Sequence, residues 1–387
     1  MSRLIYVQAQ ADHIASLAKA SPIAAIEELV WNALDADARE VRVDTITNPL
    51  GAVEAVRVSD DGTGIDLLKA DSTFGSLGGS WKRSGTMTPG AARRLHGRHG
   101  RGRFKAFALG THVEWRTTVK VGGELVSYVL SGSLDNPGVF EVVSAAETGP
   151  APGTEVYASN AGANCDTLLN AGETVRTLAS KFALYLKSYP DVRIYFNGLP
   201  VTPLVVEECT TTVALDGAKL EITEWKSRFQ GAGRLVFSGP DGFRLHEMAC
   251  GVRSGGIPFT AYLISPRFPA LAAENALVMD ELNPEVRRFV DAAKAALRKH
   301  FAEKNADTGA QAVAAWMDEG SYPYLPEEEA NEAERKRFDS LAVELSRRLE
   351  SFSDLSAGDR SIVLNLLRHA MNGVKKGTLK EFIRSRK

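Results

Sequence analysis

Residues 21–38 read SPIAAIEELVWNALDADA, and this stretch decides the fold of the first third of the chain. Ser21 is a good helix N-cap, because its hydroxyl can accept a hydrogen bond from a backbone N–H of the first turn. Pro22 suits the first helical position, where a missing N–H costs nothing. The sequence therefore predicts a helix that begins at Pro22 and continues through residue 38.

Polar residues occupy a stripe of this helix that an amphipathic helix usually reserves for apolar ones. Glu28, Asn32 and Asp35 are spaced i, i+4 and i+7, which places all three on one face. A solvated helix face would explain such a stripe, and so would a polar pocket. Glu27 precedes Glu28, and only one of the two carboxylates can face a given pocket.

Two strand patterns, EVRVDTI and AVRVSDD, follow the helix, and the second leads into SDDGTGI at residues 59–65. Asp60 therefore lies at a strand end, ahead of Gly62 and Gly64. A carboxylate there can accept a hydrogen bond from an exocyclic amine, and glycines let a flat base approach the backbone. A plain β-turn is the alternative interpretation.

Two further glycine-containing stretches carry possible phosphate and base contacts. Residues 97–107 read GRHGRGRFKAF, where closely spaced glycines can expose backbone N–H groups to an anion. The alternative is a flexible loop. The glycines are Gly97, Gly100 and Gly102, and the flanking cations are Arg98, Arg101, Arg103 and Lys105. Farther on, Gly153-Thr154 begins a strand-like run, GTEVYAS.

The four stretches, in this order and spacing, resemble the motifs of the GHKL ATPases (gyrase, heat-shock chaperone, histidine kinase and MutL). The family's first motif, Glu-x-x-x-Asn-Ala-x-Asp-Ala, matches residues 28–36, and its Asp-x-Gly-x-Gly matches residues 60–64. The resemblance covers residues 20–160. It implies an α+β fold, with a Bergerat-type ATP-binding α/β sandwich at the N-terminus.

The resemblance also implies roles for single residues. Glu28 would be the general base that activates water, and Asn32 would ligate Mg²⁺. Asp60 would bind the adenine amine with support from Thr154, and a lid over residues 74–102 would close over the triphosphate. The implied ATP-binding set is Asn32, Asp35, Asp60, Gly62, Gly64, Lys82, Gly97, Gly100, Arg101, Gly102 and Thr154.

Beyond the first domain, the patterns predict two more units. We expect the ATP-binding domain over residues 1–190, a β/α transducer-like domain over 191–305, and a helical C-terminal extension over 306–387. In relatives with this plan the transducer domain donates a Lys or Arg to the γ-phosphate. Four cations are candidates for that role here, and the sequence does not choose among them: Lys226, Arg228, Arg253 and Arg267.

Composition narrows the class of protein further. The net charge of −2 carries no nucleic-acid signature, so any polyanion contact must come from a local patch such as residues 93–105. The three cysteines share no metal-ligand spacing and predict reduced thiols rather than a disulfide scaffold. No stretch resembles a signal peptide or a membrane span, so we expect a cytoplasmic protein.

These features predict Mg²⁺-dependent ATP hydrolysis that drives a conformational switch in an ATP-dependent homodimer. DNA maintenance or defence against foreign DNA is the favoured context, with DNA or an effector protein as partner. A chaperone-like ATPase and a non-hydrolysing ATP-binding scaffold are the alternatives. A histidine kinase is disfavoured, because the motifs begin too near the N-terminus for a preceding dimerisation helix pair.

Overall fold

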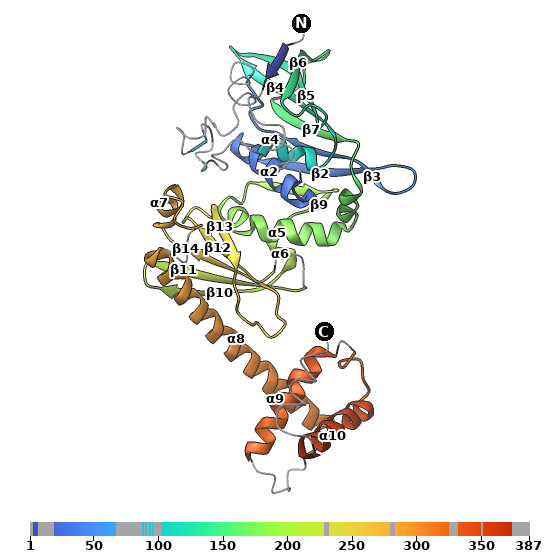
Figure 1. The fold of residues 1–387 in the computed structure, drawn as a ribbon, viewed down its shortest axis with the longest axis vertical. Coiled ribbons are helices and arrows are strands. Elements are labelled where there is room, and N and C mark those ends of the chain that lie inside the picture. Colours follow the sequence, from blue (N-terminus) through green and yellow to red (C-terminus); the bar gives the residue numbers. More distant parts are fainter. Residues whose placement is uncertain are drawn as a thin grey trace.

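The computed structural model describes residues 3–6, 19–66, 87, 88, 90, 93, 95, 102–227, 232–278, 283–324, 332–349 and 351–373. The predicted α+β class is confirmed. The described residues form one sheet of nine strands and one of five, here called the first and second sheets. Figure 1 shows helices between the two sheets, and a long helix that leads from the second sheet to a helical C-terminal region.

The first sheet has the strand order β1-β6-β5-β4-β7-β3-β2-β8-β9. It is mixed, because β2 and β8 pair in parallel while the other neighbours are antiparallel. Its strands are β1 (Arg3–Tyr6), β2 (Glu40–Thr47), β3 (Val53–Asp60), β4 (His112–Val121), β5 (Glu124–Ser133), β6 (Val139–Ser144), β7 (Gly153–Ser159), β8 (Arg193–Phe196) and β9 (Leu199–Pro200).

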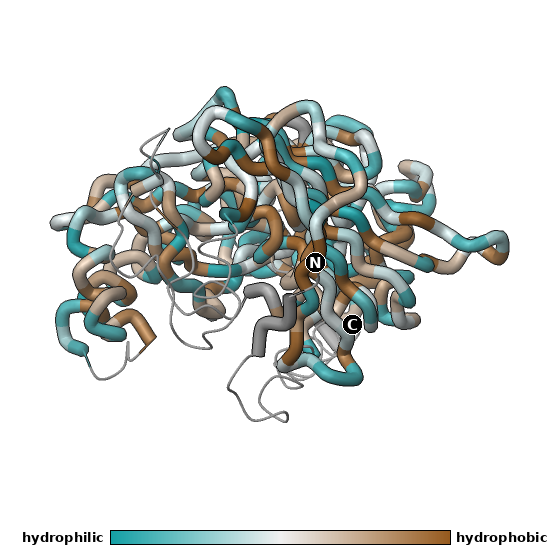
Figure 2. Tube along the Cα trace, turned by 90° about the horizontal axis from the view of Figure 1, so that it is seen from above, coloured by the Kyte–Doolittle hydropathy of each residue, from teal (hydrophilic) through white to brown (hydrophobic). Residues whose placement is uncertain are grey.

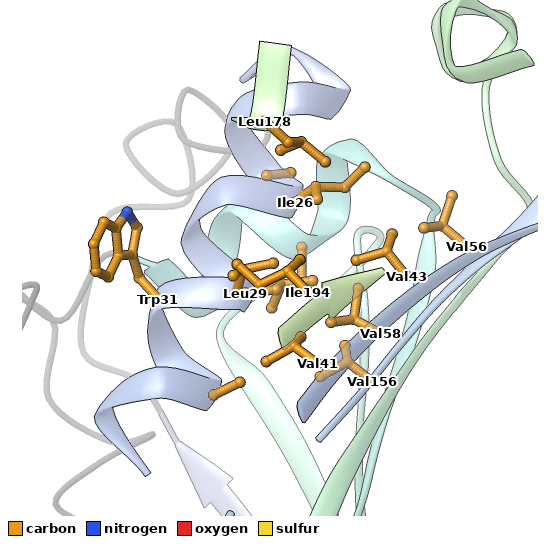
Figure 3. Close-up of a cluster of buried hydrophobic side chains, with 14 of the residues drawn as sticks. Ile26, Leu29, Trp31, Val41, Val43, Val56, Val58, Val156, Leu178 and Ile194 are labelled. Carbon is orange, nitrogen blue, oxygen red and sulfur yellow. The ribbon is translucent and has the colours of Figure 1, made fainter. Parts of the chain in front are cut away.

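Helices cover one face of the first sheet. Ile26 and Leu29 of the first long helix point toward Val41, Val43 and Val58 of the sheet (Figure 3), and all of them are buried. Polar residues alternate with these valines along β2 and β3, as the period of a half-buried strand requires. The covering elements are α2 (Pro22–Asp35), α4 (Gly102–Lys105), η2 (Ala106–Ala108), η3 (Ala163–Leu169) and α5 (Ala171–Ser188).

Helix α2 begins where the sequence predicts. The Ser21 hydroxyl accepts a hydrogen bond from the Ala24 backbone N–H at 3.3 Å, and Pro22 is the first helical residue. The helix ends at Asp35, three residues before the end of the quoted stretch, and Asp37 then takes a positive φ of 63°. That left-handed residue turns the chain back toward β2.

The second sheet has the order β10-β11-β14-β12-β13, and its central strands are buried on both faces. Along β12, Leu235 and Phe237 belong to a core shared with α7 and α8, whereas Val236 belongs to the core of the first sheet. Helix α5 therefore lies between the sheets. The elements are α6 (Pro203–Val206), β10 (Glu207–Leu215), β11 (Ala218–Trp225), β12 (Arg234–Ser238), β13 (Arg244–Ala249), β14 (Phe259–Ile264) and α7 (Phe268–Ala273).

The strand at residues 193–196 differs from the sequence interpretation, which placed it in the second unit. It is β8, and it pairs in parallel with β2 of the first sheet. Ile194 and Phe196 of β8 are buried in the first core, so its apolar side chains complete that core instead of the next one. Strands of the second sheet begin only at Glu207.

Helix α8 (Pro284–Asp318) continues past residue 305, where the second predicted unit ends. Its 35 residues join two cores: Phe289 and Phe301 pack under the second sheet, and Trp316 packs with α9 (Glu332–Arg348) and α10 (Ala357–Gly373). Apolar (brown) and polar (teal) segments alternate along the chain in Figure 2. Among the described helices, none has the length and apolar character needed to cross a membrane.

Candidate nucleotide-binding site

The first and third motifs meet at an ion pair. Glu28 Oε2 of α2 lies 2.8 Å from Lys105 Nζ, and the two side chains are 16% and 32% exposed. Asn32 follows one turn later on α2, and Asp35 is buried in its last turn. The predicted polar stripe therefore faces the end of the glycine-rich stretch, and a solvated helix face does not describe it.

Helix α4 holds Lys105 in this position through its neighbour in the chain. Phe104 is fully buried, and its ring lies 6.1 Å from the ring of Phe140 in β6. Adjacent residues on a helix point about 100° apart. The buried Phe104 ring thus fixes α4 against the first sheet, while Lys105 reaches toward α2.

The second motif forms a turn that is attached to the end of α2. The Gly62 N–H donates to Asp60 Oδ1 at 2.9 Å, and the Thr63 N–H donates to the Ala36 carbonyl oxygen at 2.8 Å. Asp61 has a different task, because its Oδ1 accepts from the backbone N–H groups of Arg39 and Glu40 at 2.7 and 2.8 Å. Asp60 is therefore the carboxylate of this motif that remains to bind a ligand.

The environment of Asp60 shifts its titration toward neutral pH. Burial raises the pKa of Asp60 to about 6, while hydrogen bonds from the backbone N–H groups of Gly62 and Thr154 oppose the rise. A carboxylate in this state gains from any further donor, because a hydrogen bond to the charged form favours ionisation. An exocyclic amine of a nucleotide base is such a donor.

The fourth motif completes the floor of the site. Thr154 of β7 is opposite Asp60 of β3 in the sheet register, and its Oγ1 lies 3.2 Å from Oγ1 of Thr117. A Cβ on Gly153 would lie 2.4 Å from the Asp60 carbonyl oxygen, so only glycine allows the two strands to approach this closely.

Thr117 of β4 was not among the predicted site residues. Its Oγ1 also accepts a hydrogen bond from the Ile65 N–H at 2.8 Å, which ties the end of the second motif to the fourth. A threonine in an alternating strand is common, so the sequence carries no local signal for this role.

Gly64 has a geometry that no other residue can adopt without strain. Its φ is +75°, and an added Cβ would lie 2.1 Å from the carbonyl oxygen of Thr118. Backbone of the second motif therefore touches β4 directly at this point, as a site that admits a flat base requires.

Part of the predicted lid lies outside the described residues, including Lys82, Gly97, Gly100 and Arg101. Gly102 is described and begins α4. Arg93 corrects one expectation, because its side chain is only 3% exposed and cannot offer a polyanion contact. It donates instead to the Ala38 carbonyl oxygen at 2.8 Å and to the Tyr185 hydroxyl at 3.3 Å. This residue anchors the chain before the third motif to the turn that follows α2 and to α5.

The predicted cations of the second unit lie in several places. Arg267 pairs with Glu285 at 3.0 Å, Lys226 and Arg253 are exposed, and Arg228 lies outside the described residues. Arg244 of β13, which was not predicted, reaches α2. Its Nη1 lies 3.0 Å from Oε1 of Glu27.

The donors of the site fit a magnesium ion that arrives with a nucleotide. Asn32 offers an amide oxygen, and Mg²⁺ commonly takes one or two protein oxygens together with phosphates and waters. Over the part of the chain that the structure describes, no group of three His, Cys, Asp or Glu side chains could hold a metal by itself.

Comparison with known families agrees with this geometry. Residues 20–132 match the family described as histidine kinase-, DNA gyrase B- and HSP90-like ATPase, a range that contains the first three motifs. A search of curated protein sequences gave no significant match. Over residues 20–132 this chain is therefore similar to the GHKL ATPases.

Proposed function

We propose that this chain binds Mg²⁺ and ATP in the site on α2 and hydrolyses the γ-phosphate, with Glu28 as the general base. The ion pair between Glu28 and Lys105 carries the proposal. It brings a carboxylate and a phosphate-binding cation together at the end of the glycine-rich stretch, one helical turn from Asn32. Phosphoryl transfer to water depends mainly on such positioning and electrostatics.

The same ion pair supports a simple order of events. In this structure the Lys105 ammonium contacts the Glu28 carboxylate. A triphosphate carries more negative charge than one carboxylate, so it would draw Lys105 toward its oxygens. Glu28 is then free to orient a water molecule and to accept its proton during attack on the γ-phosphate.

We assign the base end of the nucleotide to the second and fourth motifs. Asp60 would accept a hydrogen bond from the adenine amine, with Thr154 beside it and Gly64 leaving room for the ring. The raised pKa of Asp60 supports this assignment, because an added donor relieves the cost of burying the charge. Asp35 would shape the pocket from the last turn of α2.

Asn32 would hold Mg²⁺ through its amide oxygen. The ion would neutralise charge on the β- and γ-phosphates, as it does in other phosphoryl-transfer sites. Lys82, Gly97, Gly100, Arg101 and Gly102 would belong to the lid that closes over the phosphates.

We further propose that ATP drives a switch in a homodimer that acts on DNA. The contact between the second sheet and α2 supports a switch, since it links the nucleotide site to a second domain. Two parts of this proposal, a basic transducer residue at the γ-phosphate and a DNA partner, are based on the resemblance to MutL, MORC proteins and type II topoisomerases. Those proteins share the two-domain plan.

Steady-state phosphate release from Mg²⁺ and ATP tests this function. Wild type, Glu28→Ala and Glu54→Gln are compared with and without double-stranded DNA, where Glu54 is an exposed carboxylate of β3 that serves as the control. We expect turnover in wild type and in Glu54→Gln, and loss of turnover but not of ATP binding in Glu28→Ala. Stimulation by DNA would support the DNA role, and stimulation by unfolded protein would favour a chaperone-like role instead. Tight binding without turnover in wild type would indicate a scaffold.

A further inference from the structure

Glu27 and Glu28 are neighbours on α2, yet they contact different parts of the molecule. Glu28 contacts Lys105 at the nucleotide site. Glu27 contacts Lys181 of α5 at 2.7 Å and Arg244 of β13 at 3.0 Å. The second sheet thus holds the residue that precedes the proposed general base.

An aromatic contact accompanies this ion pair, one helical turn along α2. The ring of Trp31 lies 5.8 Å from the ring of Phe243, the residue before Arg244. Figure 3 shows Trp31 on the side of α2 that points away from the first sheet. Phe243 and Arg244, which are consecutive in the second domain, therefore contact Trp31 and Glu27. These two residues are spaced i, i+4 on one face of α2.

Polar groups and open space surround Arg244. A cleft of about 250 Å³ lies where α5 meets the second sheet, and Arg244 lines it together with Lys181, Arg234 and Glu247. Glu247 contacts both Arg244 and Arg234. Val236 of the second sheet packs in the core of the first sheet, but beside it the cleft and the exchangeable ion pairs leave room for small shifts.

We propose that Arg244 is a positioning residue for ATP hydrolysis, which acts on Glu28 through Glu27 and helix α2. A helix turn is stiff, so a displacement of Glu27 by the second sheet also displaces Glu28. Because small errors in the position of a catalytic group are costly, the arrangement makes the rate of hydrolysis depend on the position of the second sheet. This inference rests on the proposed function and names the contact that regulates it.

Kinetics of Arg244→Met and Glu27→Gln test the proposal. We expect each to lower kcat for ATP about tenfold, with KM changed less than about twofold, because the pair orients the base without touching the nucleotide. If Arg244 acts through Glu27, the double variant is no slower than either single one. Arg244→Lys keeps the charge and is expected to restore most of kcat.

Arg234→Met is the matched control. Arg234 lines the same cleft and contacts Glu247 at 3.4 Å, but it belongs to β12, whereas the residue that contacts α2 belongs to β13. It is expected to leave kcat unchanged. Wild-type kcat in Arg244→Met, or additive losses in the double variant, would overturn the proposal while loss of turnover in Glu28→Ala still upheld the ATPase function.

Hydrogen exchange provides a readout that needs no turnover. We expect a non-hydrolysable ATP analogue with Mg²⁺ to change the exchange of β13 in wild type and in Arg234→Met, but not in Arg244→Met. Exchange of β13 that ignores the bound analogue in wild type would also overturn the proposal. Thermal unfolding of each variant shows whether the protein remains folded.

Discussion

Two adjacent faces of helix α2 each present a glutamate and a second residue four positions later, but the two faces contact different parts of the molecule. Glu28 contacts Lys105 of α4 and Asn32 follows one turn later, while Glu27 and Trp31 face α5 and the second sheet. Each face has a carboxylate held by a cation and a second residue one turn later. A rotation of about 100° along one helix thus separates the proposed chemistry from the proposed domain contact.

The difference teaches that residue type does not identify the proposed catalytic carboxylate here. Both glutamates are partly buried and ion-paired. What distinguishes them is the partner: Lys105 belongs to the third nucleotide motif, whereas Arg244 comes from a strand 217 residues away in the sequence. The two cations should accordingly give different kinetic signatures.

Lys105→Met is expected to have the largest effect on nucleotide binding. Loss of a charge-assisted phosphate contact costs about 1.5–3 kcal/mol, which corresponds to a fall in ATP affinity of about 10- to 100-fold. Isothermal titration with ATP and Mg²⁺ measures it, and Arg244→Met is the comparison because its affinity should stay near wild type. Equal losses of ATP affinity in the two variants would contradict the claim that only the Lys105 face of α2 binds the nucleotide.

Arg93→Met is expected to lower the free energy of unfolding by about 3 kcal/mol. The substitution removes a buried cation from its contacts with the Ala38 carbonyl, the Tyr185 hydroxyl and Asp37. Chemical denaturation measures this effect. If Arg93 only lined a polyanion surface, the variant would unfold at the same denaturant concentration as wild type.

The titration of Asp60 should make the affinity for ATP depend on pH. Its pKa of about 6 means that the free protein gains a proton as the pH falls through 6, and the protonated carboxyl no longer offers its charge to the adenine amine. We expect affinity to fall up to about tenfold between pH 6 and pH 5. Asp60→Asn should bind weakly at both pH values, with the pH dependence lost.

The same raised pKa sets the sign of a stability effect. Because the folded-state pKa of Asp60 exceeds its ordinary value of 3.8, its contribution to stability is present in full below about pH 4 and is lost as the pH rises through 6. At pH 7 the nucleotide-free Asp60→Asn variant should therefore be more stable than wild type, by on the order of 3 kcal/mol. A less stable variant in thermal unfolding at pH 7 would contradict this.

Thr117→Val should have the smallest effect. It removes the hydroxyl that accepts from the Ile65 N–H and contacts Thr154, so the loss is about 1 kcal/mol, or about fivefold in ATP affinity. Ser127 is a control on the neighbouring strand, because its hydroxyl contacts Thr118 and not the motif residues. Ser127→Ala is expected to bind ATP as wild type does.

The sequence predicted those parts of the site whose signals are local. Ser21 and Pro22 mark the start of α2, and the spacing of Glu28 from Asn32 defines one face of it. The turn at Asp60 follows from a strand that runs into closely spaced glycines. Each of these features depends on residues a few positions apart, so the chain itself displays them.

Contacts between distant segments were not predictable in the same way. Strand β8 joins the first sheet through parallel pairing with β2, which no local pattern encodes. Arg93 lies in a stretch rich in cations, and nothing in that stretch marks it as buried. The contact of Arg244 with Glu27 depends on how the second sheet packs on α5, which follows from tertiary structure alone.

Single-turnover hydrolysis of Mg²⁺-ATP by Glu28→Gln and Glu27→Gln tests the central claim most directly. The two variants remove the same charge from adjacent positions of one helix. The account predicts that Glu28→Gln binds ATP as wild type does and hydrolyses it about 10²- to 10⁴-fold more slowly, while Glu27→Gln slows about tenfold. Hydrolysis by Glu28→Gln at the rate of Glu27→Gln or faster would contradict the assignment of Glu28 as the base.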